Sequence, residues 1–520
     1  MSGRFVRSSK YRHVFGRPTR KANPEYLAVN WDATGGGAFA VIPTSERGKL
    51  PDRIPLFRGH TAVVLDTDWN PFNDSLIASG SDDGKVFLWR VPENFSLRLD
   101  IPADAVEDIA PVGKLSGHPK KVGHVLFNPA AENVLASASG DFTVKIWDVE
   151  AGSAKLSLKV GDVIQSMSWS ANGSLLVTTS RDKKLRIWDA RQEKPAQEVA
   201  GHQGAKNSRA VWMGEHDRIA TTGFSRMSDR QLALWDIKAL RQPVDGFHML
   251  DSISGVCIPF WDDGTQCLYL AGKGDGNIRY YEYENDKFEY LSEYKSADPQ
   301  RGIAFLPKRG VNMHENEVAR AYKTVSDTYI EPISFIVPRR SETFQDDIYP
   351  PTVGLKPAMS SKEWFDGAER LPPKISLESL YEGTGIQEVS SETLEKSAKA
   401  SRPVKPAEKA TKEVDQGEPE KTPVSVRAPP PSIKEQGNSM MAVATGTTDS
   451  ADPAIEAAEP ETAEPTTTAT SPTSGIGGTD ALEREINNIK TMMAQQTRLL
   501  ASLSTTVQDL VSEVKSLKRR

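Results

Sequence analysis

The sequence predicts an all-β seven-bladed propeller, followed by a disordered linker and a C-terminal α-helical coiled coil. The first observation is the stretch 116–148, which opens with Gly117-His118, passes through two predicted strands, turns at Asp141 and closes with Trp147-Asp148. The second observation is that this pattern recurs at intervals close to the period of about 40–45 residues expected for one blade. A four-stranded blade buries its faces only against neighbouring blades, so one such unit implies several more.

The recurrence is clearest as an Asp followed six residues later by an aromatic residue. The five pairs are Asp83 and Trp89, Asp141 and Trp147, Asp182 and Trp188, Asp229 and Trp235, and Asp275 and Tyr281. Successive Asp residues are 58, 41, 47 and 46 residues apart, which fits one blade per unit with loops of variable length. A Gly-His pair opens the first, second and fourth units, and the third and fifth units lack it.

These residue types are typical of WD repeats. In such a repeat the His, a strand Ser or Thr, the turn Asp and the Trp form a partly buried hydrogen-bonded chain, so that each polar group leaving water finds a partner. We expect this structural role, rather than catalysis or metal binding, for His60, Asp83, Trp89, His118, Asp141, Trp147, Asp182, Trp188, His202, Asp229 and Trp235.

Strands at both ends of the repeat array raise the blade count to seven. Residues 26–32 and Gly37–Pro43 read as two strands of a degenerate first unit, and the repeats run to about residue 294. Residues 302–307, Glu317–Val325 and residues 331–338 read as strands of a last unit. Because a ring must close, we expect residues 11–15 to supply a further strand to that last blade.

Basic residues crowd the N-terminus around this expected closing strand. They are Arg7, Lys10, Arg12, Arg17, Arg20 and Lys21. They either protect a solvated strand edge against aggregation or form a surface for an acidic partner, and charge alone does not separate these alternatives. A nucleic-acid partner is disfavoured, because the whole chain has a net charge of −6.

Composition excludes several classes of protein. Cys257 and Cys267 are the two cysteines and form no C-x-x-C pair, so we expect two buried free thiols and neither a disulfide framework nor a zinc site. No apolar run approaches about 18 residues and the N-terminus lacks an apolar signal segment, so we expect a cytosolic protein without a membrane span. We expect no enzyme and no cofactor, because the G-x-S-x-G, H-E-x-x-H and Walker motifs do not occur.

Six strings give the chain a resemblance to a known family. They occupy residues 9–16 (SKYRHVFG), 35–43 (GGGAFAVIP), 221–236 (TTGFSRMSDRQLALWD), 272–282 (GKGDGNIRYYE), 299–310 (PQRGIAFLPKRG) and 337–350 (VPRRSETFQDDIYP). Together they resemble a coronin over roughly the first 380 residues, and ordinary WD repeats do not share them.

The resemblance implies a propeller that binds and cross-links filamentous actin and helps regulate branched assembly by the actin-related protein 2/3 complex. It further implies a place in the cytoplasm and cytoskeleton, at cortical or endocytic actin patches. The alternative is a generic WD-repeat scaffold or adaptor whose partner is not actin.

The chain departs from the coronin pattern between the strings Phe15-Gly16 and GGGAFA. Only 18 residues, 17–34, separate them, where coronins carry a longer connection with another strand and a basic residue implicated in filament binding. We therefore expect a first blade that is short of a strand, and weaker or displaced actin binding.

The rest of the chain divides by composition. After a propeller at residues 1–343, we expect residues 344–395 to pack on it through Trp364 and Phe365. Residues 396–479 read as a disordered linker. In the linker, a basic block at 396–434 and an acidic block from 435 are typical of a self-repelling solvated spacer. The alternatives are a microtubule or actin contact for the basic block and a contact with the nucleating complex for the acidic block.

Residues 480–520 carry a heptad repeat, in which apolar residues alternate at steps of four and three. The seam is Ile486, Ile489, Met493, Leu500, Leu503, Val507, Leu510, Val514 and Leu517, with Gln496 in register. This pattern predicts a parallel coiled coil that makes the protein a homo-oligomer. Leu499 and Val511 widen the apolar face, so we favour a trimer over a dimer.

Overall fold

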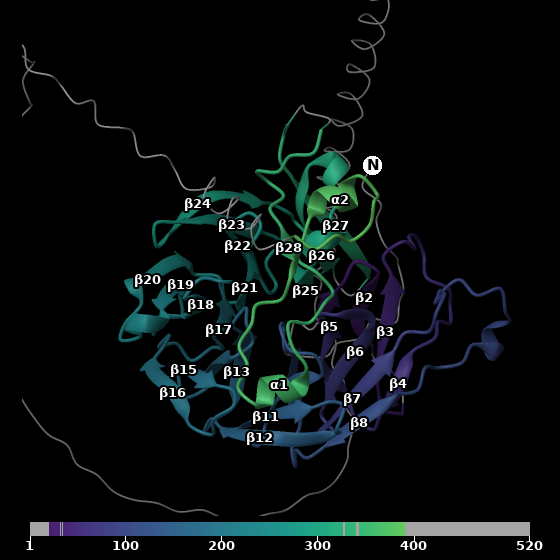
Figure 1. The fold of residues 1–520 in the computed structure, drawn as a ribbon, viewed down its shortest axis with the longest axis horizontal. Helices are drawn as coiled ribbons and strands as arrows, with labels where there is room; N and C mark the ends of the chain where they lie inside the picture. Colours follow the sequence, from purple (N-terminus) through teal and green to yellow (C-terminus); the bar gives the residue numbers. More distant parts are fainter. Residues whose placement is uncertain (1–19, 32, 34, 326–327, 340–342, 390–520) are drawn as a thin grey trace, which may run out of the picture. The chain divides into compact units, whose positions relative to one another are not determined.

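The computed structural model describes residues 20–389, apart from residues 32, 34, 326–327 and 340–342. The expected closing strand at 11–15, the linker and the coiled coil lie outside the described residues. Within them, seven antiparallel sheets stand around one axis, so the predicted seven-bladed propeller is confirmed (Figure 1). No helix of the described part is long and apolar enough to cross a membrane.

Each sheet is one blade, numbered here from the N-terminus. Blade 1 is β1 (Arg20–Ala22), β2 (Tyr26–Trp31), β3 (Gly37–Pro43) and β4 (Phe57–His60); blade 2 is β5 (Val64–Asn70), β6 (Asn73–Ser81), β7 (Lys85–Arg90) and β8 (Gly113–Ser116). Blade 3 is β9 (Val122–Phe127), β10 (Val134–Ser139), β11 (Thr143–Asp148) and β12 (Ser153–Lys159); blade 4 is β13 (Ile164–Trp169), β14 (Leu175–Ser180), β15 (Lys184–Asp189) and β16 (Pro195–Ala200).

The later blades follow the same order. Blade 5 is β17 (Arg209–Trp212), β18 (Arg218–Phe224), β19 (Arg230–Asp236) and β20 (Val244–Asp251); blade 6 is β21 (Cys257–Asp262), β22 (Cys267–Gly272), β23 (Ile278–Glu284) and β24 (Lys287–Tyr294). Blade 7 is β25 (Gln300–Phe305), β26 (Glu317–Val325) and β27 (Tyr329–Ile336). Short 3-10 helices lie in the connections at Ala103–Ala105, Ile237–Ala239, Lys308–Gly310 and Met313–Glu315.

Apolar side chains fill the space between neighbouring blades. One cluster joins Ala78 and Val86 of blade 2 to Val122, Leu135 and Trp147 of blade 3. The Trp residues of the predicted pairs in blades 2 to 5 are fully buried in such clusters. Alternating strand residues therefore face the two neighbours of each blade, which explains why one repeat cannot fold alone.

The innermost strand of each blade faces the axis, and side chains of the preceding blade satisfy part of its open edge. Asp66 and Asp68 of β5 accept hydrogen bonds from the backbone N–H groups of Val125 (3.0 Å) and Phe127 (2.8 Å) of β9. Ser168 of β13 likewise accepts one from the backbone N–H of Trp212 on β17, at 3.0 Å. Buried backbone donors that lack a strand partner are thus satisfied across the blade boundary.

Blade 1 corrects one expectation. The short connection at residues 17–34 still supplies β1, whose residues 20–22 pair antiparallel with residues 27–29 of β2, so blade 1 has four strands. The expected lack of a strand is therefore wrong. Blade 7 has three strands in the described residues, and Arg309, which follows its first strand, ties it to Asp74 of blade 2 through a 2.6 Å ion pair.

Strand direction divides the ring into two faces. We call the bottom face the one that carries the turns between the first and second strands of each blade, such as residues 128–133 and 170–174. The top face carries the turns between the second and third strands and the loops that lead into the next blade, such as residues 117–121 and 225–229.

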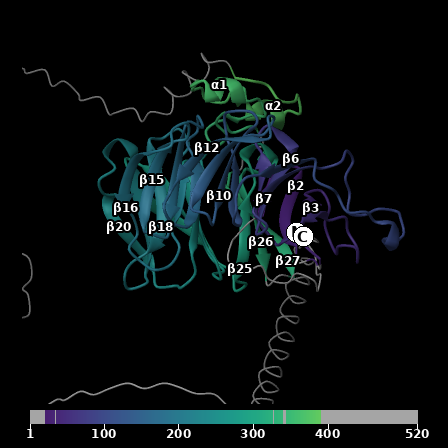
Figure 2. The same ribbon diagram turned by 90° about the horizontal axis from the view of Figure 1, so that it is seen from below.

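Residues 343–389 form an extension against the bottom face (Figure 2). It contains β28 (Thr352–Val353), α1 (Ser361–Phe365), β29 (Lys374–Ile375) and α2 (Leu377–Tyr381). Backbone bonds join it to blade 3, from Ala358 N–H to the Ala130 carbonyl (2.9 Å) and from Glu132 N–H to the Met359 carbonyl (3.0 Å). The backbone of the extension therefore pairs with the turn between β9 and β10 of blade 3.

Trp364 is the deepest anchor of the extension. The Ser360–Glu363 capping box starts α1 and directs Trp364, which is fully buried, into the groove between blades 3 and 4. Its indole N–H donates to the Gly173 carbonyl at 3.0 Å, and its ring meets that of Trp169 edge to face at 6.1 Å. One side chain therefore supplies both the apolar area and the polar contact.

We expect Trp364→Ala to destabilise the protein by about 3–5 kcal/mol, because it leaves a cavity and removes one of the two donors to the buried Gly173 carbonyl, which keeps only the Asn128 side-chain amide (2.8 Å). Chemical denaturation of the full chain, monitored by tryptophan fluorescence, measures the loss. Phe365→Ala is the control, because Phe365 is partly exposed and should cost less. Equal stability of wild type and Trp364→Ala would contradict the anchoring role.

Candidate functional site on the top face

Blades 2 and 3 carry the hydrogen-bonded chain that the repeats predict. In blade 2, His60 Nδ1 lies 2.9 Å from Asp83 Oδ2, and His60 Nε2 lies 2.7 Å from Ser79 Oγ, which also accepts from the Trp89 indole N–H at 2.8 Å. In blade 3 the same contacts join His118, Asp141, Ser137 and Trp147, at 2.8, 2.8 and 2.7 Å. Each of these hydrogen-bonded chains connects a top-face turn to the strands of its own blade.

In blade 4, different residues provide the hydrogen-bond partners of the turn Asp and of the Trp indole. Asp182 has no histidine partner, and the guanidinium of the buried Arg186 takes its place, 2.5 Å from Asp182 Oδ2 and 2.7 Å from Ser180 Oγ. The Trp188 indole N–H donates to Thr178 Oγ1 at 2.9 Å. Sequence reasoning missed Arg186, although its position four residues after Asp182, without a preceding Gly-His, was a usable signal.

Blade 5 corrects the role predicted for Asp229. His202 Nε2 lies 2.9 Å from Thr221 Oγ1, which also accepts from the Trp235 indole N–H at 2.8 Å. However, His202 Nδ1 faces Gln231 Oε1 at 3.4 Å, while the Asp229 carboxylate accepts from Ser225 Oγ at 2.9 Å. The loop between β18 and β19 is two residues longer than the Gly140–Phe142 turn of blade 3. Asp229 therefore accepts its hydrogen bond from within this loop rather than from His202.

Burial keeps these histidines neutral. Loss of water lowers the pKa of His60 and of His118, against the opposing effect of their Asp partners, and lowers the pKa of His202 to about 4. With neutral rings the direction of each chain is fixed: Trp donates to the hydroxyl, the hydroxyl to Nε2, and Nδ1–H to the acceptor at the turn. The arrangement suits a structural role, and the described residues contain no group of three His, Cys, Asp or Glu that could hold a metal.

The turn carboxylates point inward, and this leaves the exposed charge of the top face mainly basic. Asp83, Asp141, Asp182, Asp229 and Asp275 all accept hydrogen bonds within their own loops or from a neighbouring strand. Among the described residues, the exposed cations of the top-face loops are Lys120, Lys121, Arg181, Lys183, Arg226 and Lys295, and exposed Arg301 lies at the start of β25. Asp82 is an exposed exception. This basic surface is a candidate site for an acidic partner.

Arg209 of blade 5, Lys273 of blade 6 and Arg301 of blade 7 lie close enough to interact electrostatically. Burial lowers the pKa of Lys273, in the turn between β22 and β23, and the charges of Arg209 and Arg301 lower it further. Three blades thus bring positive charge to one side of the channel mouth. Sequence reasoning missed this cluster, because its members are 28 to 92 residues apart and share no motif.

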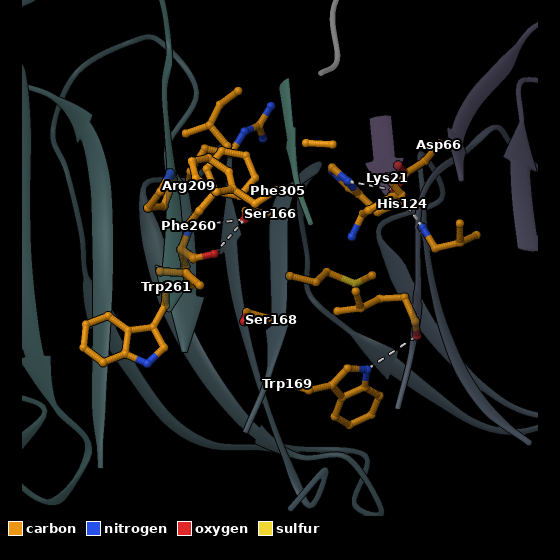
Figure 3. A pocket seen from close by; sticks show the side chains of 18 of the residues that line it. Lys21, Asp66, His124, Ser166, Ser168, Trp169, Arg209, Phe260, Trp261 and Phe305 are labelled. Carbon is orange, nitrogen blue, oxygen red and sulfur yellow. Dashed lines mark hydrogen bonds and ion pairs between the residues drawn. The ribbon is translucent and has the colours of Figure 1, made fainter. Parts of the chain in front are cut away.

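The axial channel itself is a cavity of about 490 Å³ (Figure 3). Lys21 projects from β1 into the channel and pairs with Asp68 at 3.0 Å, and His124 lies 3.7 Å from Asp66 beside it. Burial disfavours the Lys21 charge, but Asp68 and Asp66 outweigh that effect and raise its pKa. Phe260, Phe305 and Trp261 line the opposite side.

The predicted N-terminal basic surface is thus placed only in part. Lys21 lies on the channel wall rather than among the outward cations of the top face, and Arg20 begins β1. Arg7, Lys10, Arg12 and Arg17 lie outside the described residues. Cys257 and Cys267 are free and buried, as expected, and burial raises the pKa of Cys257 to about 12, which makes it a poor nucleophile.

We expect acid to destabilise the propeller through its neutral histidines. A histidine whose pKa is 6.5 when unfolded and about 4 when folded contributes ~3 kcal/mol above pH 6.5, and this contribution is lost as the pH falls towards 4. The thermal midpoint of the full chain should therefore decrease from pH 7 to pH 4.5. His202→Gln, whose amide does not titrate, should reduce the slope, and an unchanged slope in that variant would contradict this assignment.

Comparisons with known proteins agree with this geometry. Models of the WD domain, G-beta repeat match residues 52–90, 109–148 and 156–189, and a type of WD40 repeat matches residues 330–372. A domain of unknown function matches residues 19–49. In a solved structure, the WD40 domain of Toxoplasma gondii coronin superposes with a TM-score of 0.68 at 32% identity, covering 72% of this chain and 95% of that domain.

Whole sequences extend the likeness beyond the ring. The coronin-like protein crn1 of Schizosaccharomyces pombe is 55% identical over 459 residues, which cover 84% of this chain and 74% of that protein. The coronin-like protein of Saccharomyces cerevisiae is 50% identical over 79% of this chain and 69% of its own length. On these grounds the chain belongs to the coronin family.

Proposed function

We propose that this chain is a non-enzymatic protein that binds actin filaments through the top face of its propeller. Membership of the coronin family supports an actin partner. The observation that supports the top face is its charge: the turn carboxylates are held inside the loops, while Lys120, Lys121, Lys183 and Arg226 project outward. Exposed cations around an acidic polymer accelerate encounter and favour one orientation of docking.

The bottom face is less suited to this role. The extension covers the turns of blades 3 and 4 there, and Lys374 of β29 forms a 2.6 Å ion pair with Glu215 of blade 5. A filament that docked on this side would have to displace contacts already made within the chain. We therefore assign the filament to the open, basic side.

Cross-linking and regulation of branched assembly form the finer part of the proposal. The heptad seam from Ile486 to Leu517 would join several propellers, and joining them raises their effective concentration on a filament. The acidic block after residue 435 is proposed to contact the actin-related protein 2/3 complex, and the basic block at 396–434 a filament or a microtubule. The protein would then act at cortical actin patches of the cytoplasm.

The N-terminal basic residues remain a second, proposed part of the filament surface. Because the connection at 17–34 lacks the basic residue that coronins carry there, we propose that this form relies more on the top-face cations of blades 2 to 7. A generic scaffold with a non-actin partner is the alternative to the whole proposal.

Reversing charge on the top face should weaken filament binding. We expect the double variant Lys120→Glu and Lys121→Glu to bind filaments about tenfold or more weakly in co-sedimentation at low salt, and the difference to shrink as salt rises. Lys362→Glu on α1 is the matched control, since Lys362 is an exposed lysine of the bottom face.

The outcomes separate the alternatives. If Lys362→Glu weakens binding and the top-face variant does not, the assignment to the top face is wrong. If wild type itself stays in the supernatant at every salt concentration, the actin proposal is wrong and the generic scaffold is favoured.

Disrupting the heptad seam should yield single copies. We expect the full chain to have a mass near three times 57.0 kDa by light scattering, and Leu500→Lys with Leu503→Lys to return it to one chain. Apparent filament affinity should fall by roughly 10²–10⁴ through lost avidity. Ala501→Lys with Thr505→Lys, at outer heptad positions, should retain the oligomer, and a wild type that runs as a single copy would contradict the coiled coil.

A further inference from the structure

Exposed apolar side chains gather on blades 5 and 6 beside the basic loops. Met227, in the loop between β18 and β19, is 83% exposed, and Met249 on β20 is 70% exposed. Other exposed members on the same two blades are Phe247, Ile253, Tyr290 and Leu291. Single exposed apolar residues are ordinary, but a group of them next to charged loops is typical of a surface that another protein covers.

Strand register places three of these residues at one corner of blade 5. Arg230 and Gln231, at the start of β19, pair with Asp251 and Met249 of β20. Met227 lies in the loop that leads into β19, and Ile253 follows Asp251 by two residues in the loop that leaves β20. We call Met227, Met249 and Ile253 the blade 5 corner.

A buried arginine supports this corner from below. Arg230 is 1% exposed; its Nε lies 2.6 Å from Asp251 Oδ1 and its Nη2 lies 3.0 Å from Asp275 Oδ2 in the turn of blade 6. Gly272 leaves room for the guanidinium, because a Cβ there would come within 2.2 Å of Arg230 Nη1. The loops of blades 5 and 6 are thus held together by one ion network.

This support matters for binding. Burying an ionic network costs desolvation free energy and contributes little net stability, so its effect lies in fixing geometry. Here it fixes the loop of Met227 against the turn of Lys273. Loops that are ordered before a partner arrives lose less conformational entropy on binding than mobile loops.

Two cations lie beside the corner. Arg226 precedes Met227 and is exposed, and Lys273 occupies the neighbouring turn of blade 6. The carboxylates of Asp229, Asp251 and Asp275 are engaged by Ser225 and Arg230. The surface therefore presents apolar side chains beside cations, which is compatible with a protein-binding surface that has a dry centre and a polar rim.

We infer that the blade 5 corner is the apolar centre of the filament-binding surface, and that it takes a recess of the filament whose edge carries carboxylates. This inference rests on the proposed function and adds which side chains supply the salt-independent part of the affinity. Met227 is the main contact, because it is the most exposed of the three and its flexible side chain adapts to the surface it meets.

The test compares Met227→Ser with Arg226→Gln in filament co-sedimentation of the full chain at low and at high salt. We expect Met227→Ser to weaken binding about tenfold, equivalent to about 1.4 kcal/mol, at both salt concentrations. Arg226→Gln should weaken binding at low salt, and its effect should fade at high salt. Met227→Leu should restore most of the affinity, because it keeps the apolar volume.

Val112→Ser is the matched control, since Val112 is 62% exposed just before β8 of blade 2. Thermal midpoints of all variants should equal that of wild type, because the altered side chains are exposed. Wild-type affinity in Met227→Ser, or a loss that disappears at high salt, would overturn the inference while leaving the proposed function standing. Absence of wild-type binding would overturn the proposed function itself.

Discussion

Each blade buries its two faces only against the blades beside it, and the rest of the structure depends on this shared burial. The four tryptophans of the repeats are fully buried between adjacent sheets, and the clusters that contain them always draw residues from two blades. A row of such sheets would leave two apolar ends in water, so the ring must close. Arg309 and Asp74 contribute to that closure by pairing blade 7 with blade 2 across blade 1.

The same constraint explains the surface charge. A turn that caps a blade needs its backbone N–H groups satisfied, and an Asp at the turn satisfies them while it also accepts from a buried His or Arg. Asp141 does so with the N–H of Thr143 and with His118. Because the carboxylates are used inside the turns, the lysines and arginines beside them determine the potential outside. The positive top face is therefore a by-product of how the blades are capped.

The sequence was sufficient for the ring but not for the details of its turns. A six-residue Asp-to-aromatic offset identified five blades, and strands at the two ends supplied the others. The partners of each Asp were less predictable, since Arg186 and Gln231 fill positions that His and Asp fill elsewhere. Side chains of different type can meet one hydrogen-bonding demand. The position at which Trp364 docks could not be predicted either, because its partner Gly173 lies 191 residues away in the sequence and contributes only a backbone carbonyl.

The two faces of the ring make different kinds of contact, and this difference determines what each face can bind. The bottom turns meet a segment of the same chain, and they hold it through backbone hydrogen bonds and a buried indole. The top loops meet water, so they use exposed cations and a few apolar side chains on a rigid base. The ionic contacts among these gain little free energy per copy and weaken with salt. If the proposed coiled coil joins several propellers, a partner that repeats the same surface along a polymer would compensate for this weakness, because each further propeller would bind at a higher effective concentration.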